Sequence, residues 1–290
     1  MPAPSSSTLP LDQLVGVGRS AEVYRCGAGH VLKLYKAPWE PTAVANEFKA
    51  ASQAYRHGLP TPEPMMIVER EGRTGIVFER LEGGTLLDAG LRRPLSFLHQ
   101  VNRLAQMQQA INEHEAVDLP QQHEVARFQI AGARVSDCVK RAALAALEQL
   151  PRGTRLCHGD LHMENVICSN RGLRAVDWQK ATAGHPAGDV ARTALMLRYG
   201  SLNVGGLTRY LPLNVIRAAL ARFYVERYCQ LSGISRSHVS AWMLPVLVMR
   251  LFGQVAANED EVRAAAERLS GQAERGRCIL QTASECGAMQ

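Results

Sequence analysis

Between residues 11 and 80 the apolar residues come in short runs that are separated by turn signals. Runs of this length, rich in β-branched residues, are typical of strands. One longer segment, residues 41–57, has apolar residues at helical spacing and is followed by Gly58 as a stop signal. The pattern therefore predicts a small lobe of five strands and one helix. The predicted strands cover residues 11–18, 21–26, 30–35, 64–70 and 74–80.

Beyond residue 82 the hydrophobic pattern becomes mainly helical. Two short apolar segments interrupt it, and the residues Asn170, Arg171 and Gly172 between them predict a hairpin. Pro245 either kinks the fourth predicted helix or marks its start. The predicted helices cover residues 95–111, 125–150, 213–229, 239–256 and 259–269, and the hairpin strands cover 165–169 and 173–178. The expected class is α+β, with a small β-rich lobe followed by a larger, mainly α-helical one.

The composition is that of an ordinary globular protein: 46% of the 290 residues are apolar and 21% are charged. The net charge of +6 is modest, and no block of like charges suggests a nucleic-acid or polybasic membrane surface. No apolar run approaches the ~20 residues that span a bilayer. Seven scattered cysteines without a C-x-x-C pair indicate reduced thiols in a cytoplasmic protein. Residues 1–10 lack the features of a secretory signal and are expected to be a disordered arm.

A glycine turn and a lysine are the first candidates for chemistry. Gly16 and Gly18 lie between two predicted strands, where a turn could lay backbone amides over phosphates or could be an ordinary hairpin. Lys33 lies within the apolar strand 30–35 and needs an anionic partner there, which Glu47 or bound phosphates could supply. The alternative is a lysine that extends along a strand edge into solvent.

Three polar residues farther along the chain form the most informative pattern. Asp160 and Asn165 lie five residues apart in a polar loop, and the following hairpin returns Asp177. Carboxylate and amide oxygens are suited to Mg²⁺, which also keeps waters and takes phosphates as ligands. Asx residues also favour turns by themselves, but that explanation leaves Lys33 and the glycine turn as coincidences.

These motifs, in this order, resemble the protein-kinase-like fold, and specifically its branch of aminoglycoside phosphotransferases and choline kinase-like small-molecule kinases. The resemblance covers residues 11 to about 200. It implies a bilobal α+β fold with a small five-stranded antiparallel N-lobe containing one helix, residues 11–81, that binds the nucleotide. A larger, mainly α-helical C-lobe, residues 82–290, would hold the catalytic loop, the metal site and the acceptor-binding helices.

The resemblance assigns the nucleotide-binding residues. Gly16, Gly18 and Val23 correspond to the glycine-rich loop. Lys33 corresponds to the lysine on the α- and β-phosphates, with Glu47 as its helix partner.

The resemblance also assigns the hinge and the catalytic residues. The backbone of Glu79 and Leu81 would meet the adenine of ATP. Asp160 would orient the acceptor hydroxyl and take its proton late, while Asn165 and Asp177 would hold Mg²⁺.

Two histidines flank Asp160 in the same loop. His162 stands where protein kinases carry a phosphate-directed lysine, so it would contact the γ-phosphate or the acceptor, or else make a supporting hydrogen bond. His158 is expected to be a scaffold residue that hydrogen-bonds the loop. Gly159 replaces the protein-kinase arginine, which is the form found in the small-molecule branch.

The function expected from these motifs is ATP-dependent transfer of the γ-phosphate to a hydroxyl of a small molecule, with ATP and Mg²⁺ as cofactors and the acceptor unassigned. The alternatives are a Ser/Thr protein kinase-like enzyme and a nucleotide-binding pseudokinase regulator. No long activation segment or Ala-Pro-Glu motif follows Asp177, which weighs against peptide docking. Most of the excess positive charge lies beyond residue 80, which favours a neutral or anionic acceptor over a polycationic antibiotic.

Overall fold

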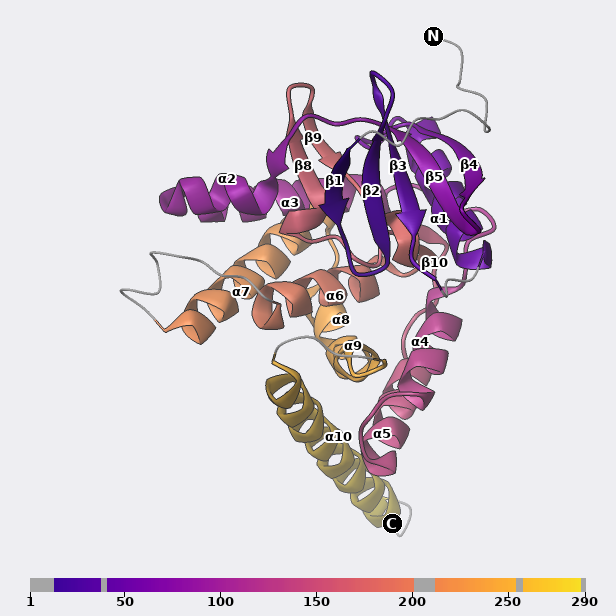
Figure 1. The fold of residues 1–290 in the computed structure, drawn as a ribbon. Helices are drawn as coiled ribbons and strands as arrows, with labels where there is room; N and C mark the ends of the chain where they lie inside the picture. Colours follow the sequence, from indigo (N-terminus) through magenta and orange to yellow (C-terminus); the bar gives the residue numbers. More distant parts are fainter. Residues whose placement is uncertain (1–12, 38–40, 201–211, 254–257, 288–290) are drawn as a thin grey trace. The chain divides into compact units, whose positions relative to one another are not determined.

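The computed structural model describes residues 13–37, 41–200, 212–253 and 258–287 (Figure 1). The predicted arm at residues 1–10 lies outside the described residues, as do residues 11 and 12 of the first predicted strand. Within the described ranges the structure confirms the predicted α+β class, with a five-stranded antiparallel sheet near the N-terminus and helices beyond it.

All five predicted strands of the first lobe are present and form one antiparallel sheet in the order β1-β2-β3-β5-β4. The predicted helix is α1 (Pro41–Arg56), which packs on β4 and β5. Successive side chains on a strand alternate between faces, so Leu32 and Leu34 enter an apolar cluster while Lys33 and Tyr35 share the opposite face. The strands are β1 (Leu14–Val17), β2 (Ala21–Cys26), β3 (His30–Tyr35), β4 (Pro64–Arg70) and β5 (Arg73–Glu79).

The predicted hairpin is also present and belongs to a second sheet with the order β6-β8-β9. Its strands are β8 (Val166–Ser169) and β9 (Gly172–Ala175), and the third strand is β6 (Gly83–Thr85). Gly83 has a φ of +145°, and a Cβ there would collide with the carbonyl of Cys168, so this strand pairing requires glycine. β7 (Arg155–Cys157) pairs with β10 (Thr182–Gly184).

Several helices differ in number or length from those that the hydrophobic periodicity predicts, and local chemistry explains the differences. The helix predicted over residues 125–150 is two helices, because Gly132 ends the first and the Ser136 hydroxyl caps the second by accepting from the Val139 amide. The short helix α2 (Leu86–Arg92) was not predicted, although Thr85 and Asp88 form a capping box at its start. The other helices before residue 150 are α3 (Phe97–Asn112), α4 (Gln122–Ala131) and α5 (Asp137–Glu148).

The helices beyond residue 185 pack around α9 (Met243–Arg250), which contacts α4, α5, α6 and α10. The helix predicted over residues 239–256 is broken at Trp242, and Pro245 lies in the first turn of α9, where the missing amide donor costs nothing. The last helix begins at Glu259 as predicted but extends to Gly287. These helices are α6 (Pro186–Tyr199), α7 (Leu213–Ser232), α8 (Arg236–Ala241) and α10 (Glu259–Gly287).

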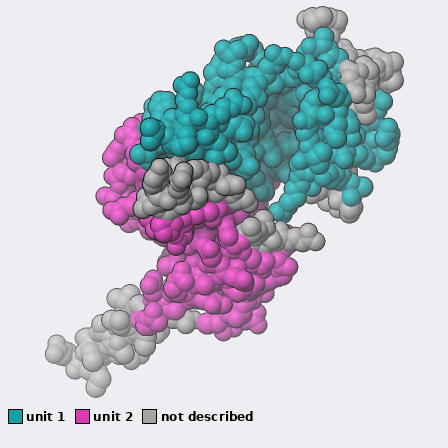
Figure 2. Space-filling model, turned by 60° about the vertical axis from the view of Figure 1, so that its left-hand side comes forward, with its two compact units in different colours: residues 1–119, 154–183 teal, residues 120–153, 184–290 magenta. Residues whose placement is uncertain are grey.

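The chain divides into two compact units, coloured separately in Figure 2. The first comprises residues 1–119 and 154–183, and the second comprises residues 120–153 and 184–290. The predicted lobe boundary near residue 82 lies inside the first unit and stays a prediction. The first unit therefore contains the five-stranded sheet, α1, the β8–β9 hairpin and the polar loop before it.

Two further predictions about the chain can be compared with the structure. Among the described helices, none combines the length and the hydrophobicity that a membrane span requires. The five cysteines in the described part of the chain whose side chains are placed, Cys26, Cys138, Cys157, Cys168 and Cys229, are all free thiols.

Burial of His123 in the second unit predicts a loss of stability at acid pH. The ring is 5% exposed, its Nε2 lies 3.2 Å from the Leu150 carbonyl oxygen, and Trp242 packs edge-on against it. Burial lowers the pKa of His123 below its ordinary value. The unfolded chain, whose histidines titrate near pH ~6.5, then binds more protons, so the free energy of unfolding falls as the pH drops below that value.

Urea unfolding between pH 7.5 and 5.0 measures the slope of the free energy of unfolding against pH. His123→Gln should reduce this slope by at most about 1.4 kcal/mol per pH unit, which is the limit for one proton. His99→Gln, at an exposed position of α3, is the control and should leave the slope unchanged. An identical slope in His123→Gln and the parent would contradict the expectation.

Candidate active site

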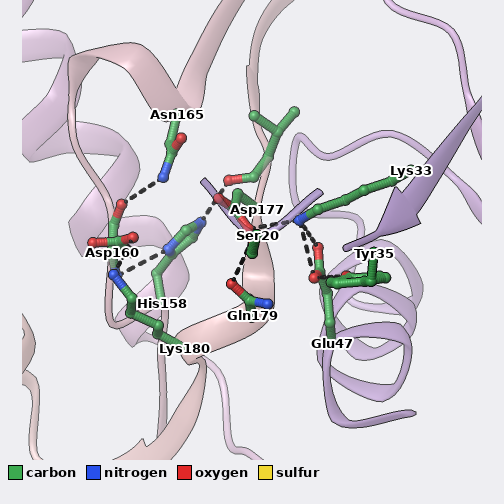
Figure 3. A network of polar contacts seen from close by, with 11 residues as sticks. Ser20, Lys33, Tyr35, Glu47, His158, Asp160, Asn165, Asp177, Gln179 and Lys180 are labelled. Carbon is green, nitrogen blue, oxygen red and sulfur yellow. Dashed lines mark hydrogen bonds and ion pairs between the residues drawn. The ribbon is translucent and has the colours of Figure 1, made fainter. Parts of the chain in front are cut away.

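Three charged side chains from distant parts of the chain meet beside the first sheet (Figure 3). Lys33 on β3 directs its Nζ at Glu47 of α1, 2.7 Å from Oε1 and 3.0 Å from Oε2. The same Nζ lies 2.7 Å from Oδ1 of Asp177, which follows β9. The structure thus brings together the lysine, its expected helix partner and the expected metal-binding aspartate.

A tyrosine that the sequence reasoning missed completes this cluster. Glu47 is only 1% exposed, and the buried hydroxyl of Tyr35 donates a hydrogen bond to its Oε2. Burial, together with the Glu47 carboxylate, raises the pKa of Tyr35, so the hydroxyl stays protonated and remains a donor. The signal was present in the sequence, because Tyr35 follows Lys33 by two residues on one strand and so shares its face.

The charge on Lys33 follows from its two carboxylate neighbours. Burial alone lowers the pKa of Lys33, but Glu47 and Asp177 together raise it above the ordinary value. The ammonium is therefore a fixed cation in the site. A cation held between two carboxylates, one buried and one about a third exposed, is arranged to receive further anionic groups on the exposed side.

The turn that carries Asp177 is anchored by the next residue, Trp178. Asp177 has a left-handed backbone, with φ of 67°, which aspartate tolerates better than most residues. Trp178 is 2% exposed, and its Nε1 donates to Oγ1 of Thr61 at 3.0 Å. Thr61 in turn donates to the Ala175 carbonyl at 3.0 Å. Trp178 therefore packs in the core, and this packing sets the position of the adjacent Asp177.

The hairpin register explains why Asn165 lies next to this turn. Val166 pairs with Ala175, and the Val176 amide donates to the Asn165 carbonyl at 2.9 Å. The Asn165 side chain donates from Nδ2 to the carbonyl oxygen of Asp160 at 3.0 Å. This bond fixes the amide so that its Oδ1 is directed away from the loop backbone. The polar loop and the aspartate after the hairpin therefore meet, as the sequence predicts.

His158 holds the backbone of the polar loop. The ring is fully buried; its Nδ1 accepts from the Asp160 amide at 3.3 Å and its Nε2 lies 3.1 Å from the Val176 carbonyl oxygen. With one acceptor and one donor nitrogen, this is a neutral imidazole. The scaffold role expected for His158 agrees with these contacts.

His162 makes a local contact of the supporting kind. Its Nδ1 accepts from the Glu164 amide at 3.3 Å and caps the 3₁₀ helix η2 (Met163–Asn165). This is the second of the two roles expected for His162; its predicted contact with the γ-phosphate or the acceptor stays a prediction.

The cation beside Asp160 is Lys180, which the sequence reasoning also missed. Its Nζ lies 2.6 Å from Oδ2 of Asp160, and the side chain extends from the 3₁₀ helix η3 (Trp178–Lys180). Gly159 has a φ of +76°, and a Cβ there would collide with the Lys180 carbonyl oxygen. The glycine of this loop is therefore needed both for its backbone conformation and for the close approach of η3.

The glycine turn joins β1 to β2 in the same unit. Gly16 pairs with Val23 in the sheet, and the Gly18 amide donates to the Ala21 carbonyl at 2.8 Å. Neither glycine has a positive φ, and a Cβ on Gly16 would meet only ordinary van der Waals contact. The turn's own conformation thus does not demand glycine at Gly16, which leaves close approach of a ligand as a reason for it. Ser20 in the turn donates to Oε1 of Gln179 at 3.3 Å.

The predicted hinge residues lie at and just beyond the end of β5. The Glu79 carboxylate is paired with Arg171, and its amide donates to the Glu63 carbonyl at 2.9 Å. Leu81 lines a cavity of about 190 Å³ together with Gly29, Arg80 and the β8–β9 turn. Contact of Glu79 and Leu81 with adenine stays a prediction.

The donor set that the sequence predicts for a metal is the Asp177 carboxylate and the Asn165 amide oxygen. The described part of the chain holds no group of three or more His, Cys, Asp and Glu side chains placed to bind a metal. Two oxygen donors from the protein fit Mg²⁺, which completes its shell with waters and phosphates, better than they fit a metal that needs an all-protein cage.

The solved structures that match this fold include aminoglycoside phosphotransferases. A thermostable mutant of APH(4)-Ia, in ternary complex with AMP-PNP and hygromycin B, has a TM-score of 0.61 and 20% sequence identity over 93% of each chain. APH(3'')-Id from Streptomyces rimosus has a TM-score of 0.54 and 18% identity over 80% of this chain and 90% of the other. At these identities the likeness shows the fold, which is protein-kinase-like as expected.

The comparison with curated protein sequences finds no match. The sequence model of the phosphotransferase enzyme family matches residues 13–223, which include every residue of the site described above. The catalytic-loop motif, the lysine and its glutamate, and the aspartate after the hairpin all lie within this match, on the fold that the solved phosphotransferases share. The chain therefore belongs to the phosphotransferase enzyme family.

Proposed function

We propose that the protein transfers the γ-phosphate of ATP to a hydroxyl group of a small molecule. The observation that supports this most directly is the convergence, within one compact unit, of Lys33, Glu47 and Asp177 with the loop that carries Asp160 and Asn165. A solved relative of the fold was captured with AMP-PNP and hygromycin B, a nucleotide analogue and a small hydroxyl compound. The free cysteines are consistent with the cytoplasm as the compartment.

The nucleotide half of the site consists of a cation and a turn. Lys33 would bind the α- and β-phosphates, because its ammonium stays charged and is oriented by Glu47, which Tyr35 in turn holds. The glycine turn at residues 16–20 would cover the phosphates with backbone amides.

Asn165 and Asp177 would hold Mg²⁺, and their oxygen donors fit that ion. When bound, Mg²⁺ neutralises charge on the phosphates. Oδ1 of Asp177 lies 2.7 Å from Nζ of Lys33. The two side chains would therefore act on the same triphosphate, Lys33 by direct contact and Asp177 through the Mg²⁺ that it holds. Asn165 keeps its amide oriented through its bond to the Asp160 carbonyl.

Asp160 would receive the acceptor. As the bond between the γ-phosphorus and the bridging oxygen of ADP breaks, the acceptor oxygen bonds to phosphorus and its proton passes to the Asp160 carboxylate. Phosphoryl transfer has a loose transition state, so alignment and charge neutralisation contribute most of the catalysis. An ordinary aspartate, with a pKa of about 3.9, is too weak a base to deprotonate an alcohol early, so orientation is the larger part of its work.

Substitution of the two aspartates should separate nucleotide binding from transfer. Asp160→Asn should keep Mg·ATP affinity and lose at least about a hundredfold in turnover, because only the acceptor loses its partner. Asp177→Ala should lose Mg²⁺-dependent nucleotide binding. Titration calorimetry with Mg·ATP measures the affinity, and release of ADP measures turnover. Equal nucleotide affinity in the parent and both variants would sink the assignment.

Removal of the Tyr35 hydroxyl should weaken nucleotide binding indirectly, because this hydroxyl contacts Glu47 and would not itself contact a phosphate. Tyr35→Phe leaves Glu47 short of one donor, so Lys33 is held less well, and the Kd for Mg·ATP should rise by about tenfold, the equivalent of about 1.4 kcal/mol for a hydrogen bond to a charged group. Tyr24→Phe is the matched control, because the Tyr24 hydroxyl donates at 3.0 Å to Glu22, which lies on the same strand, β2. An unchanged Kd in Tyr35→Phe would show that the hydroxyl does not orient the pair.

The acceptor class can be found by measuring ADP release with sugars, amino alcohols, nucleosides, aminoglycosides and an array of hydroxyl peptides. Turnover is expected with a neutral or anionic small molecule, because positive charge predominates beyond residue 80. Asp160→Asn is the blank. Transfer to peptides alone would identify a protein kinase, and tight Mg·ATP binding with no turnover on any acceptor would identify a regulator without catalysis.

A further inference from the structure

The ion pair between Lys180 and Asp160 places a cation directly on the carboxylate expected to receive the acceptor. Nζ of Lys180 lies 2.6 Å from Oδ2 of Asp160 (Figure 3). The Asp160 side chain is 15% exposed and the Lys180 side chain is 48% exposed. The cation comes from the loop that follows Asp177, and no sequence pattern predicted it.

The backbone of Lys180 is held in place by two independent contacts. The Lys180 carbonyl packs so closely on Gly159 that no side chain fits there. Trp178, two residues before Lys180 in the same 3₁₀ helix, is anchored in the core by its bond to Thr61. The Lys180 side chain therefore starts from a fixed point next to the catalytic loop, so its ion pair costs less conformational entropy than a pair on a mobile loop.

The other cationic or titratable side chains near the site are engaged elsewhere. Lys36 donates to the Gly18 carbonyl at 2.7 Å, and Lys33 is held by Glu47 and Asp177. His158 faces the Asp160 amide with an accepting nitrogen, and His162 caps η2. Lys180, by contrast, has its Nζ 2.6 Å from Oδ2 of Asp160 and is in direct contact with that carboxylate.

We infer that Lys180 is a positioning residue for phosphoryl transfer, whose ammonium holds the Asp160 carboxylate in the orientation that receives the acceptor hydroxyl. This inference rests on the proposed function. A hydrogen bond between two charged groups is short and strong, so it restricts the rotation of the carboxylate and fixes the direction of its oxygens. The acceptor proton is transferred to Asp160, and Lys180 itself neither gains nor loses a proton.

The test compares Lys180→Met, which removes the charge at similar length, with Lys180→Arg, which restores it. Lys140→Met is the matched control, because Lys140 forms an ion pair with Asp137 on α5 in the other unit. Three quantities are measured for each variant: kcat and KM with the acceptor found above, and the Kd for Mg·ATP. Asp160→Asn is the blank for turnover.

Lys180→Met should lower kcat by about tenfold to a hundredfold, less than the full effect of a general base. The Kd for Mg·ATP and the KM for the acceptor should both stay within about twofold of the parent, because Lys180 would orient Asp160 without contacting the nucleotide. Lys180→Arg should recover most of each change, and Lys140→Met should match the parent.

Three outcomes would be decisive against parts of this account. An unchanged kcat in Lys180→Met, with an active parent, overturns the inference and leaves the proposed function standing. A loss of Mg·ATP affinity that matches the loss of kcat assigns Lys180 to the nucleotide and also overturns it. A parent that transfers phosphate to no acceptor overturns the proposed function, and the inference with it.

Discussion

The arrangement of the site depends on one constraint: the carboxylate of Glu47 is buried and must be neutralised where it lies. A buried carboxylate without a partner would cost several kcal/mol, so the strand and helix around it are held to a geometry in which Lys33 reaches it. The alternation of β3 gives that geometry, since Leu32 and Leu34 enter the apolar cluster and turn Lys33 and Tyr35 to the other face. The same alternation that builds the core thus builds the cation site.

The second half of the site is positioned by hydrogen-bonded pairing and not by charge. The register of the β8–β9 hairpin sets Asn165 beside Val176, and the buried Trp178 sets the direction in which Asp177 leaves the hairpin. Lys33 then joins the two halves through Asp177. Because rigid elements hold both ends of this ion pair, its polar groups are oriented before any ligand arrives, and preorganisation of this kind is what electrostatic catalysis requires.

Much of the first unit could be predicted from the sequence, because its elements are specified locally. Short apolar runs with turn residues between them predicted all five strands, and the paired spacing of Asp160, Asn165 and Asp177 predicted a common site. The helices were harder. Apolar residues continue at helical spacing through residues 125–150, yet Gly132 and Ser136 divide the segment into two helices. Whether a single glycine ends a helix depends on tertiary packing, which the sequence alone does not show. The helix α2 is too short to show a period at all.

The residues that sequence reasoning missed share a physical reason. Tyr35, Gln179 and Lys180 act through partners that are distant in the chain or on another element, so no local spacing marks them. His162 differs from these residues, because its hydrogen bond to the Glu164 amide is local and is the supporting role that its position suggested. A cation beside a carboxylate can come from any loop that approaches it closely enough, and here Gly159 permits that approach by η3. Gly159 is therefore the feature of this loop that admits η3, and with it the Lys180 ammonium, to the Asp160 carboxylate.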